Sequence, residues 1–201
     1  METVMLVIYA AASLLGPALA VAAYSGLFHS VVVQTRAYPL PRLTLLYKFI
    51  RGPFEDLQPV FEELSRLAPG EKWMGLYYDN PYQVKPEDIR SALGCIVSEG
   101  DAPPNLSLKR LLEAKGYREI QLPTAEKAIH TTFPWRNRLS FFIAMKRVWD
   151  ALINYQIKHS LAAHPWMEVF GDGMIRFVGV LDHHADFYVP ETGGAVTRRQ
   201  D

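Results

Sequence analysis

Val4-Met-Leu-Val-Ile-Tyr-Ala-Ala-Ala-Ser-Leu-Leu-Gly-Pro-Ala-Leu-Ala-Val-Ala-Ala-Tyr-Ser-Gly-Leu-Phe28 is an apolar stretch without a single charged side chain. As an α-helix these 25 residues measure roughly 37 Å, and the hydrocarbon core of a bilayer is about 30 Å thick. We therefore predict a transmembrane anchor over residues 4–28, with the lipid bilayer as its partner. The rest of the chain is then a domain tethered to a membrane.

This stretch has two alternative interpretations. A cleaved signal peptide fits the small residues of Ala18-Leu-Ala20, but such peptides carry a positive region before an apolar core of about 7–15 residues. Here the only charged side chain before the stretch is Glu2. A buried core helix would be unusual in a small domain, because the stretch has no polar face. The anchor is the favoured prediction.

Charge and cysteine content predict the orientation of the anchor. Arg36, Arg42 and Lys48 follow it before the first acid, Glu55. The positive-inside rule then places the N-terminus in the lumen and the C-terminal domain in the cytosol. A single cysteine, Cys95, cannot form an internal disulfide, as expected in a reducing compartment. The predicted protein is single-pass.

The composition after the anchor is that of one balanced domain. All 21 Lys and Arg residues and 20 of the 21 Asp and Glu residues lie from Arg36 onward, which leaves a formal charge of +1. Nucleic-acid binding usually needs a basic patch or a strongly basic domain. We therefore predict no direct nucleic-acid binding.

The hydrophobic pattern predicts an α+β domain over residues 42–190, between a juxtamembrane connector (29–41) and a disordered tail (191–201). Strand, helix, strand, strand occurs twice, which indicates an antiparallel sheet with helices on one side and a concave seam between the repeats. The predicted strands are 43–50, 72–78, 91–97, 117–122, 127–133, 166–170, 174–180 and 185–189, and the predicted helices are 54–67, 106–115 and a long one over 141–155.

Short motifs in this order resemble known families. The repeated pattern, with Gly52-Pro-Phe54 before the first helix and Asp186-Phe-Tyr-Val-Pro190 at the end, resembles the GyrI-like (SOUL, effector-binding) domain family. The chain is also similar, over most of its length, to the testis-expressed ER-phagy receptor family. The motifs that carry this second resemblance are Ala23-Tyr-Ser-Gly-Leu27, Tyr47-Lys-Phe49, Tyr77-Tyr-Asp-Asn-Pro81, Ser98-Glu-Gly100 and the same Asp186–Pro190 segment.

The resemblance implies a location and a role. It implies a single-pass protein of the endoplasmic reticulum membrane whose cytosolic GyrI-like domain acts as an adaptor or receptor in reticulophagy, the autophagy of the endoplasmic reticulum. It also implies two partners, the ubiquitin-like autophagy modifiers and the p97 segregase. In that family a long acidic tail carries the autophagy-modifier motif. This sequence ends 11 residues after Pro190, so we expect a short form without the tail and assign neither partner to a residue.

One internal motif has the form that autophagy modifiers bind. Phe61-Glu-Glu-Leu64 offers an aromatic and an aliphatic residue at the required spacing, but such motifs bind as an added strand. Here Phe61 and Leu64 fall on the apolar face of a predicted helix. Core packing is therefore the favoured interpretation.

The relatives that bind cationic aromatic ligands imply a set of cleft candidates. These relatives use a buried acid among aromatic rings, and the plausible counterparts are Tyr77, Tyr78, Trp135, Glu168 and Asp186. Ordinary core packing of these residues is the alternative, and a tethered small-molecule binder or hydrolase is the alternative function. We expect no enzyme activity, catalytic residue, cofactor or metal site, and interpret His183-His184 as a solvated turn.

Overall fold

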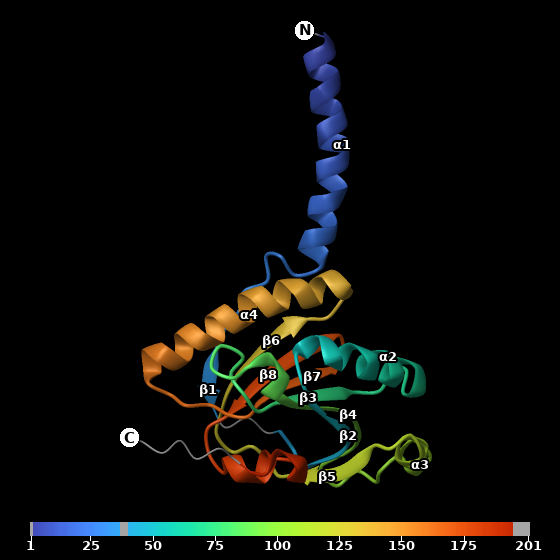
Figure 1. Ribbon diagram of the computed structural model, residues 1–201. Coiled ribbons are helices and arrows are strands. Elements are labelled where there is room, and N and C mark those ends of the chain that lie inside the picture. The colour runs from blue at the N-terminus through green and yellow to red at the C-terminus, as the bar shows by residue number, and fades with distance from the viewer. Residues whose placement is uncertain (1, 37–39, 195–201) are drawn as a thin grey trace.

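The computed structural model describes residues 2–36 and 40–194, and its centre is one antiparallel sheet (Figure 1). The sheet has eight strands in the order β1-β6-β8-β7-β3-β4-β2-β5. The strands are β1 (Gln34–Arg36), β2 (Leu43–Arg51), β3 (Trp73–Tyr77), β4 (Arg90–Glu99), β5 (Arg118–Leu122), β6 (Ala128–Pro134), β7 (Trp166–Gly171) and β8 (Met174–Val180).

Four α-helices accompany the sheet: α1 (Glu2–Tyr24), α2 (Gln58–Leu67), α3 (Leu106–Ala114) and α4 (Arg138–His159). Pro59 lies in the first turn of α2, where a missing backbone N–H costs little. Asn105 caps α3 by accepting a hydrogen bond from the Leu108 N–H. Asn137 and Ser140 form a capping box at the start of α4. Short 3-10 turns occur at η1 (Phe54–Leu57), η2 (Pro86–Asp88), η3 (His184–Phe187) and η4 (Pro190–Thr192).

The predicted repeat is present in the sheet. The first repeat contributes the neighbouring strands β2, β4 and β3, and the second contributes β7, β8 and β6 in the reverse spatial order. The two repeats meet where β3 pairs with β7. The α+β class and the antiparallel sheet predicted from the sequence are therefore confirmed.

The two faces of the sheet are covered in different ways. On one face, α4 packs Ala144, Val148 and Leu152 against β6 and β8, while α2 and α3 cover the first repeat. On the other face, irregular chain places Phe187 and Val189 over a second apolar cluster. Burial on both faces means that every residue of the central strands has a packing role.

The C-terminal region differs from the prediction. Residues 185–189 were predicted as a strand, but His184–Phe187 is a 3-10 turn whose apolar side chains cover the sheet instead of extending it. The prediction of disorder from residue 191 was wrong for Glu191 and Thr192. Glu191 accepts hydrogen bonds from the Tyr47 hydroxyl (2.8 Å) and the Arg118 guanidinium (2.7 Å). Residues 195–201 lie outside the described residues.

The stretch predicted as an anchor (4–28) lies in α1 only as far as Tyr24, where the helix ends, and α1 stands out from the domain (Figure 1). The predicted connector (29–41) contains a short strand, β1 (Gln34–Arg36), which pairs with β6. Within residues 2–36 and 40–194, no helix combines the length and the apolar character needed to cross a membrane.

A buried ion pair fastens the C-terminal segment to the sheet. Asp79 Oδ1 and Arg90 Nη2 lie 2.7 Å apart, and both side chains are less than a tenth exposed. Arg90 also donates to the Thr192 carbonyl at 2.8 Å. The pair therefore links the turn after β3 to the segment that covers the second face.

We predict that Asp79→Ala lowers the free energy of unfolding by about 3–5 kcal/mol, because it leaves the Arg90 charge buried without its partner. Urea unfolding followed by circular dichroism measures this change. The matched control is Asp101→Ala, which removes the partner of Arg42 in a solvent-exposed pair and should change little. Equal effects of the two substitutions would contradict the conclusion that the buried Asp79–Arg90 pair fastens the C-terminal segment to the sheet.

Candidate functional site

The central strand pair brings together two of the predicted residues, Tyr77 and Glu168. Gly75 of β3 lies directly opposite Glu168 of β7, and Tyr77 lies opposite Trp166. A side chain at position 75 would collide with the Tyr77 hydroxyl, because a Cβ there would lie 2.8 Å from it. Gly75 therefore leaves the space through which the Tyr77 hydroxyl donates to Glu168 Oε2 at 2.9 Å.

Glu168 is a buried carboxyl group with two donors. It is 2% exposed and is hydrogen-bonded by Tyr77 and by the indole of Trp149 on α4. Burial raises the pKa of Glu168 from 4.5 to about 7, although the two donors act in the opposite direction. Burial and the neighbouring Glu168 also raise the pKa of Tyr77 well above its usual range. The carboxyl group therefore changes its charge near neutral pH.

Aromatic rings surround this carboxyl group. The Trp149 and Trp166 ring centroids are 5.1 Å apart, and Phe54 meets Tyr77 edge to face at 5.7 Å. The Trp166 ring lies over Gly179, where a Cβ would approach the ring to 2.6 Å. Phe54 is partly exposed, so the cluster reaches the surface beside η1.

Ser91 adds a hydroxyl group on the same face. It lies opposite Tyr77 in the pairing of β3 with β4, and residues directly opposite one another point to the same side of a sheet. Its buried Oγ has no hydrogen-bond partner among the described residues. We name the six residues Phe54, Tyr77, Ser91, Trp149, Trp166 and Glu168 the seam cluster.

The chemistry of the seam cluster suits a cation better than an anion. An ionised carboxylate supplies the charge, and aromatic faces attract cations by about 0.5–2 kcal/mol each. The Tyr77 and Ser91 hydroxyls can orient a polar group of a ligand. The seam cluster thus combines the two kinds of group, a carboxylate and aromatic rings, that recognise an aromatic or alkyl cation.

The other predicted cleft residues lie elsewhere. Tyr78 points to the opposite face, where its ring packs against Tyr188 at 4.8 Å. Trp135 packs against Phe170 at 4.9 Å, two residues along β7 from Glu168. Asp186 is exposed in η3. Of the two candidate acids, the seam contains Glu168.

The internal autophagy-modifier candidate lies in the core. Leu64 is fully buried, and the Phe61 ring packs against Trp73 and Phe170 at 6.1 Å and 5.9 Å. Both residues belong to α2, so their backbone is committed to helical hydrogen bonds. This pair cannot add a strand to a partner without unfolding α2.

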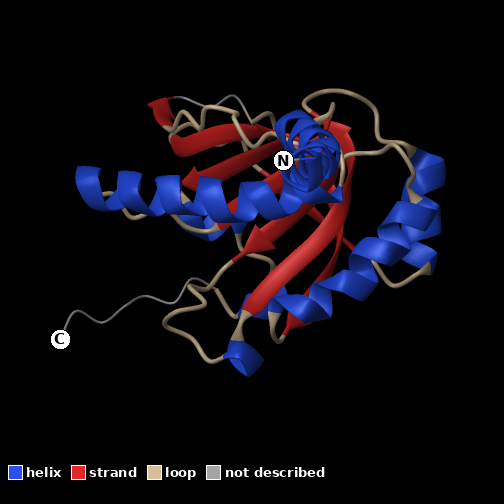
Figure 2. Cartoon of the chain, turned by 90° about the horizontal axis from the view of Figure 1, so that it is seen from above, coloured by secondary structure: helices blue, strands red, loops and turns tan. Residues whose placement is uncertain are grey.

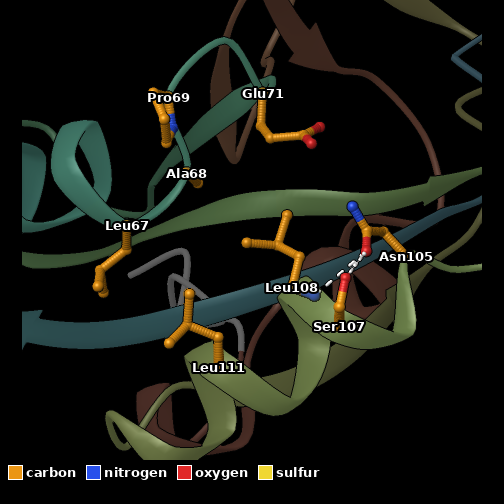
Figure 3. A pocket seen from close by; sticks show the side chains of 8 residues that line it. All are labelled: Leu67, Ala68, Pro69, Glu71, Asn105, Ser107, Leu108 and Leu111. Carbon is orange, nitrogen blue, oxygen red and sulfur yellow. Dashed lines mark hydrogen bonds between the residues drawn. The ribbon is translucent and has the colours of Figure 1, made fainter.

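Two surface hollows are smaller than typical ligand pockets, which measure about 300–1,000 Å³. The first, of about 240 Å³, lies between the C-terminal end of α2 and the start of α3 (Figure 3). The second, of about 290 Å³, contains Lys72 and Glu99, which pair with each other at 3.1 Å. Neither hollow is lined by a residue of the seam cluster.

Metal binding and thiol reactivity depend on where the His, Cys, Asp and Glu side chains lie. Across residues 2–36 and 40–194, no group of three or more His, Cys, Asp or Glu side chains could hold a metal ion. The solvated turn predicted for His183-His184 is wrong for His184, whose ring packs against His164 with centroids 3.8 Å apart and whose Nε2 is buried. Cys95 is buried in β4, and burial raises its thiol pKa to about 12, so the thiol stays protonated.

Sequence reasoning missed four members of the seam cluster: Phe54, Ser91, Trp149 and Trp166. A signal existed for Trp149, because it adjoins Val148 on the apolar side of the predicted long helix. Ser91 begins a predicted strand among apolar residues, where a hydroxyl is unusual. Phe54 contacts Tyr77 from a 3-10 turn, and Trp166 lies opposite Tyr77 only through the pairing of β3 with β7.

We predict that Glu168 makes stability depend on pH. Its pKa is higher in the folded protein (about 7) than in the unfolded chain (4.5), so the folded state binds the proton more tightly. Its favourable contribution is complete below pH 4.5 and is lost as pH rises through 7, by about 3 kcal/mol. Glu168→Gln should therefore be more stable, relative to the unsubstituted chain, at pH 8 than at pH 5. A constant difference in unfolding free energy across this range would contradict the assignment.

The chain is similar in sequence to known proteins. No family model matches the chain. It is 36% identical to mouse Testis-expressed protein 264 homolog over 172 residues, which cover 86% of this chain and 56% of that protein. It is 35% identical to human Testis-expressed protein 264 over 173 residues, or 86% of this chain and 55% of that protein. The chain thus spans just over half the length of these curated relatives.

More distant similarities extend to bacterial proteins. A DNA gyrase inhibitor of Edwardsiella ictaluri is 38% identical over 64 residues, covering 29% of this chain and 41% of that protein. A solved structure of an uncharacterized conserved protein from Listeria innocua aligns with a TM-score of 0.46 and 9% identity, covering 72% of this chain and 92% of that one. The chain is homologous to Testis-expressed protein 264 and, distantly, to a GyrI-like DNA gyrase inhibitor.

Proposed function

We propose that this chain is an adaptor anchored in the membrane of the endoplasmic reticulum, with a GyrI-like domain that binds partners in the cytosol. Similarity to Testis-expressed protein 264 over 86% of this chain supports the proposal. The role we assign is non-enzymatic and belongs to reticulophagy and p97-linked protein handling. Because the chain spans just over half of those relatives, its partners are part of the proposal.

The observation that carries the proposal is the uncharged run from Val4 to Phe28 together with its position. The helix α1 that it forms stands away from the domain, and Leu15 and Leu19 are more than half exposed. Apolar side chains on a free-standing helix favour transfer out of water by about 25 cal/mol per Å². Insertion into a bilayer would satisfy this preference and would leave Arg42 and Lys48 in the cytosol.

The partners must use surfaces other than Phe61 and Leu64. These two side chains are part of the core, so their replacement would unfold α2 before it tested any contact. The autophagy modifiers and the p97 segregase are therefore proposed as partners on resemblance alone. Proximity labelling by the full chain in cells identifies which proteins the cytosolic domain meets.

We predict that Leu15→Arg combined with Leu19→Arg releases the chain from membranes. A central Arg costs about 2.5–3.5 kcal/mol in a transmembrane helix, so two should outweigh the favourable insertion of α1. The measurement is the fraction of the full chain that stays in the membrane pellet after an alkaline carbonate wash.

The control is Leu106→Arg, which places the same charge on an exposed position of α3. This variant should stay in the pellet with the unsubstituted chain. An unsubstituted chain that washes into the supernatant would refute membrane anchoring.

A second candidate function is favoured by the seam cluster. A tethered small-molecule binder would use Glu168 as counter-ion and the rings of Trp149 and Trp166 as walls for a lipophilic aromatic cation. The pKa of Glu168 near 7 means that such a ligand would bind with release of a proton at slightly acidic pH. Displacement of the partly exposed Phe54 would open the route from the surface.

We predict that tetraphenylphosphonium raises the melting temperature of the full chain held in detergent micelles. A ligand at a hundred times its dissociation constant stabilises the folded state by about 2.7 kcal/mol. Glu168→Gln should remove most of this stabilisation, because it keeps the shape and loses the charge.

The control for this measurement is Glu113→Gln, which neutralises an exposed acid of α3 outside the seam. Its response to the cation should equal that of the unsubstituted chain. Equal responses of the Glu168→Gln and unsubstituted chains, including no response in either, would exclude the seam cluster as the binding site.

A further inference from the structure

The foot of α1 is fixed to the start of α4. Ser25 Oγ accepts a hydrogen bond from Asn137 Nδ2 at 2.9 Å, and Arg147 of α4 donates to the carbonyls of Gly26 and Leu27. Gly26 lies against the Phe133 ring, where a Cβ would approach to 2.8 Å. These contacts set the direction in which α1 leaves the domain.

This fixed junction places α4 crosswise beneath α1. Figure 1 shows α4 between the sheet and the side from which α1 rises, and Figure 2, which looks down from that side, shows α4 lying across the view. The inward side chains of α4, including Ala144 and Val148, contact the sheet. Its opposite face therefore turns towards the side occupied by α1.

Exposed apolar side chains occur on the outward side of α4 and in the connector that follows α1. Phe142 is 65% exposed on α4 and Phe28 is 69% exposed in the connector, and Leu139 and Leu27 are exposed on the same two segments. Leu139 and Phe142 are three positions apart, so they share one side of the helix. We name Leu27, Phe28, Leu139 and Phe142 the collar of α1.

The charged residues in the first half of α4 are basic, and the first acid of the helix is the exposed Asp150, one turn after Lys146. From Pro134 to Trp149 the chain has four basic residues and no Asp or Glu, and from Thr3 to Thr35 it has no Lys, Arg, Asp or Glu. The basic residues are Arg136, Arg138, Lys146 and Arg147. Apolar side chains beside Lys and Arg on one helix face are typical of helices that lie in a bilayer interface.

We propose that the collar and the first half of α4 dock onto the cytosolic surface of the bilayer that holds α1, with anionic lipid headgroups bound by Arg136, Arg138 and Lys146. The inference rests on the proposed membrane anchoring and adds a surface to it. An anchored α1 already keeps the collar close to the bilayer, so docking needs no separate association step. Even modest burial of Phe28 and Phe142 in the interface then favours the docked state. Each basic residue near an anionic surface adds about a fivefold preference for the docked state.

A fluorescent probe at position 142 tests this arrangement. The full chain with Phe142→Cys is labelled with an environment-sensitive fluorophore and reconstituted into vesicles of phosphatidylcholine with phosphatidylserine. The native thiol of Cys95 is fully buried and stays unlabelled. We expect the probe emission to shift to shorter wavelength and to be quenched by lipids brominated near the headgroup, whereas a probe at Leu106→Cys on α3 keeps its aqueous spectrum.

Charge variants test the part played by anionic headgroups. In the Phe142→Cys chain, Arg138→Glu and Lys146→Glu should each reduce the ratio of docked to undocked probe about fivefold or more, and vesicles of phosphatidylcholine alone should do the same. Lys115→Glu, at the end of α3, is the matched control and should change nothing.

The outcomes separate the two proposals. If the full chain stays in the vesicle pellet but the probe at position 142 remains aqueous, the docking inference fails and anchoring stands. If the chain does not sediment with vesicles, both fail. A shift that depends on protein concentration in detergent without vesicles identifies a second copy of the chain as the occupant and overturns lipid docking.

Discussion

The pairing of β3 with β7 is the interaction on which the rest of the structure depends. It joins the two repeats into one sheet, and its register sets Gly75 against Glu168 and Tyr77 against Trp166. A shift of β7 by one residue would turn Glu168 to the opposite face, with Met74 and Leu76, where the rings and donors of the seam cluster are out of reach. The same register lets both repeats share a continuous core on each face. The contacts of Glu168 at the seam are thus a consequence of how the two repeats are joined.

Much of the fold can be predicted from local sequence patterns, but the residues of the seam cluster cannot. The period of Phe61 and Leu64 locates α2, Asn105 marks the start of α3, and Gly171-Asp-Gly173 marks the hairpin between β7 and β8. Glu168 is harder to place, because both sheet faces are covered and its neighbours Met167 and Val169 are as buried as it is. When apolar residues occupy both faces, alternation no longer reveals which way an acid points.

The path of the C-terminal segment is another feature that local sequence patterns do not predict. Phe187 and Val189 alternate like strand residues, yet both point into the core from irregular chain that crosses the sheet. Long-range hydrogen bonds hold this segment in place. Arg90 donates to the Thr192 carbonyl, and Glu191 accepts from Tyr47 and Arg118. Partners that lie 70 to 140 positions apart leave no periodic trace in the sequence.

The helix α4 connects the two proposed surfaces. On its inner side, Trp149 donates a hydrogen bond to Glu168. On its outer side, the exposed Phe142 faces the side from which α1 rises. Arg147, two residues before Trp149, holds the carbonyls at the foot of α1. A rigid helix cannot shift at one of these contacts while the others stay fixed. One helix thus carries both a hydrogen bond to the buried carboxyl group and the contacts that hold the foot of α1.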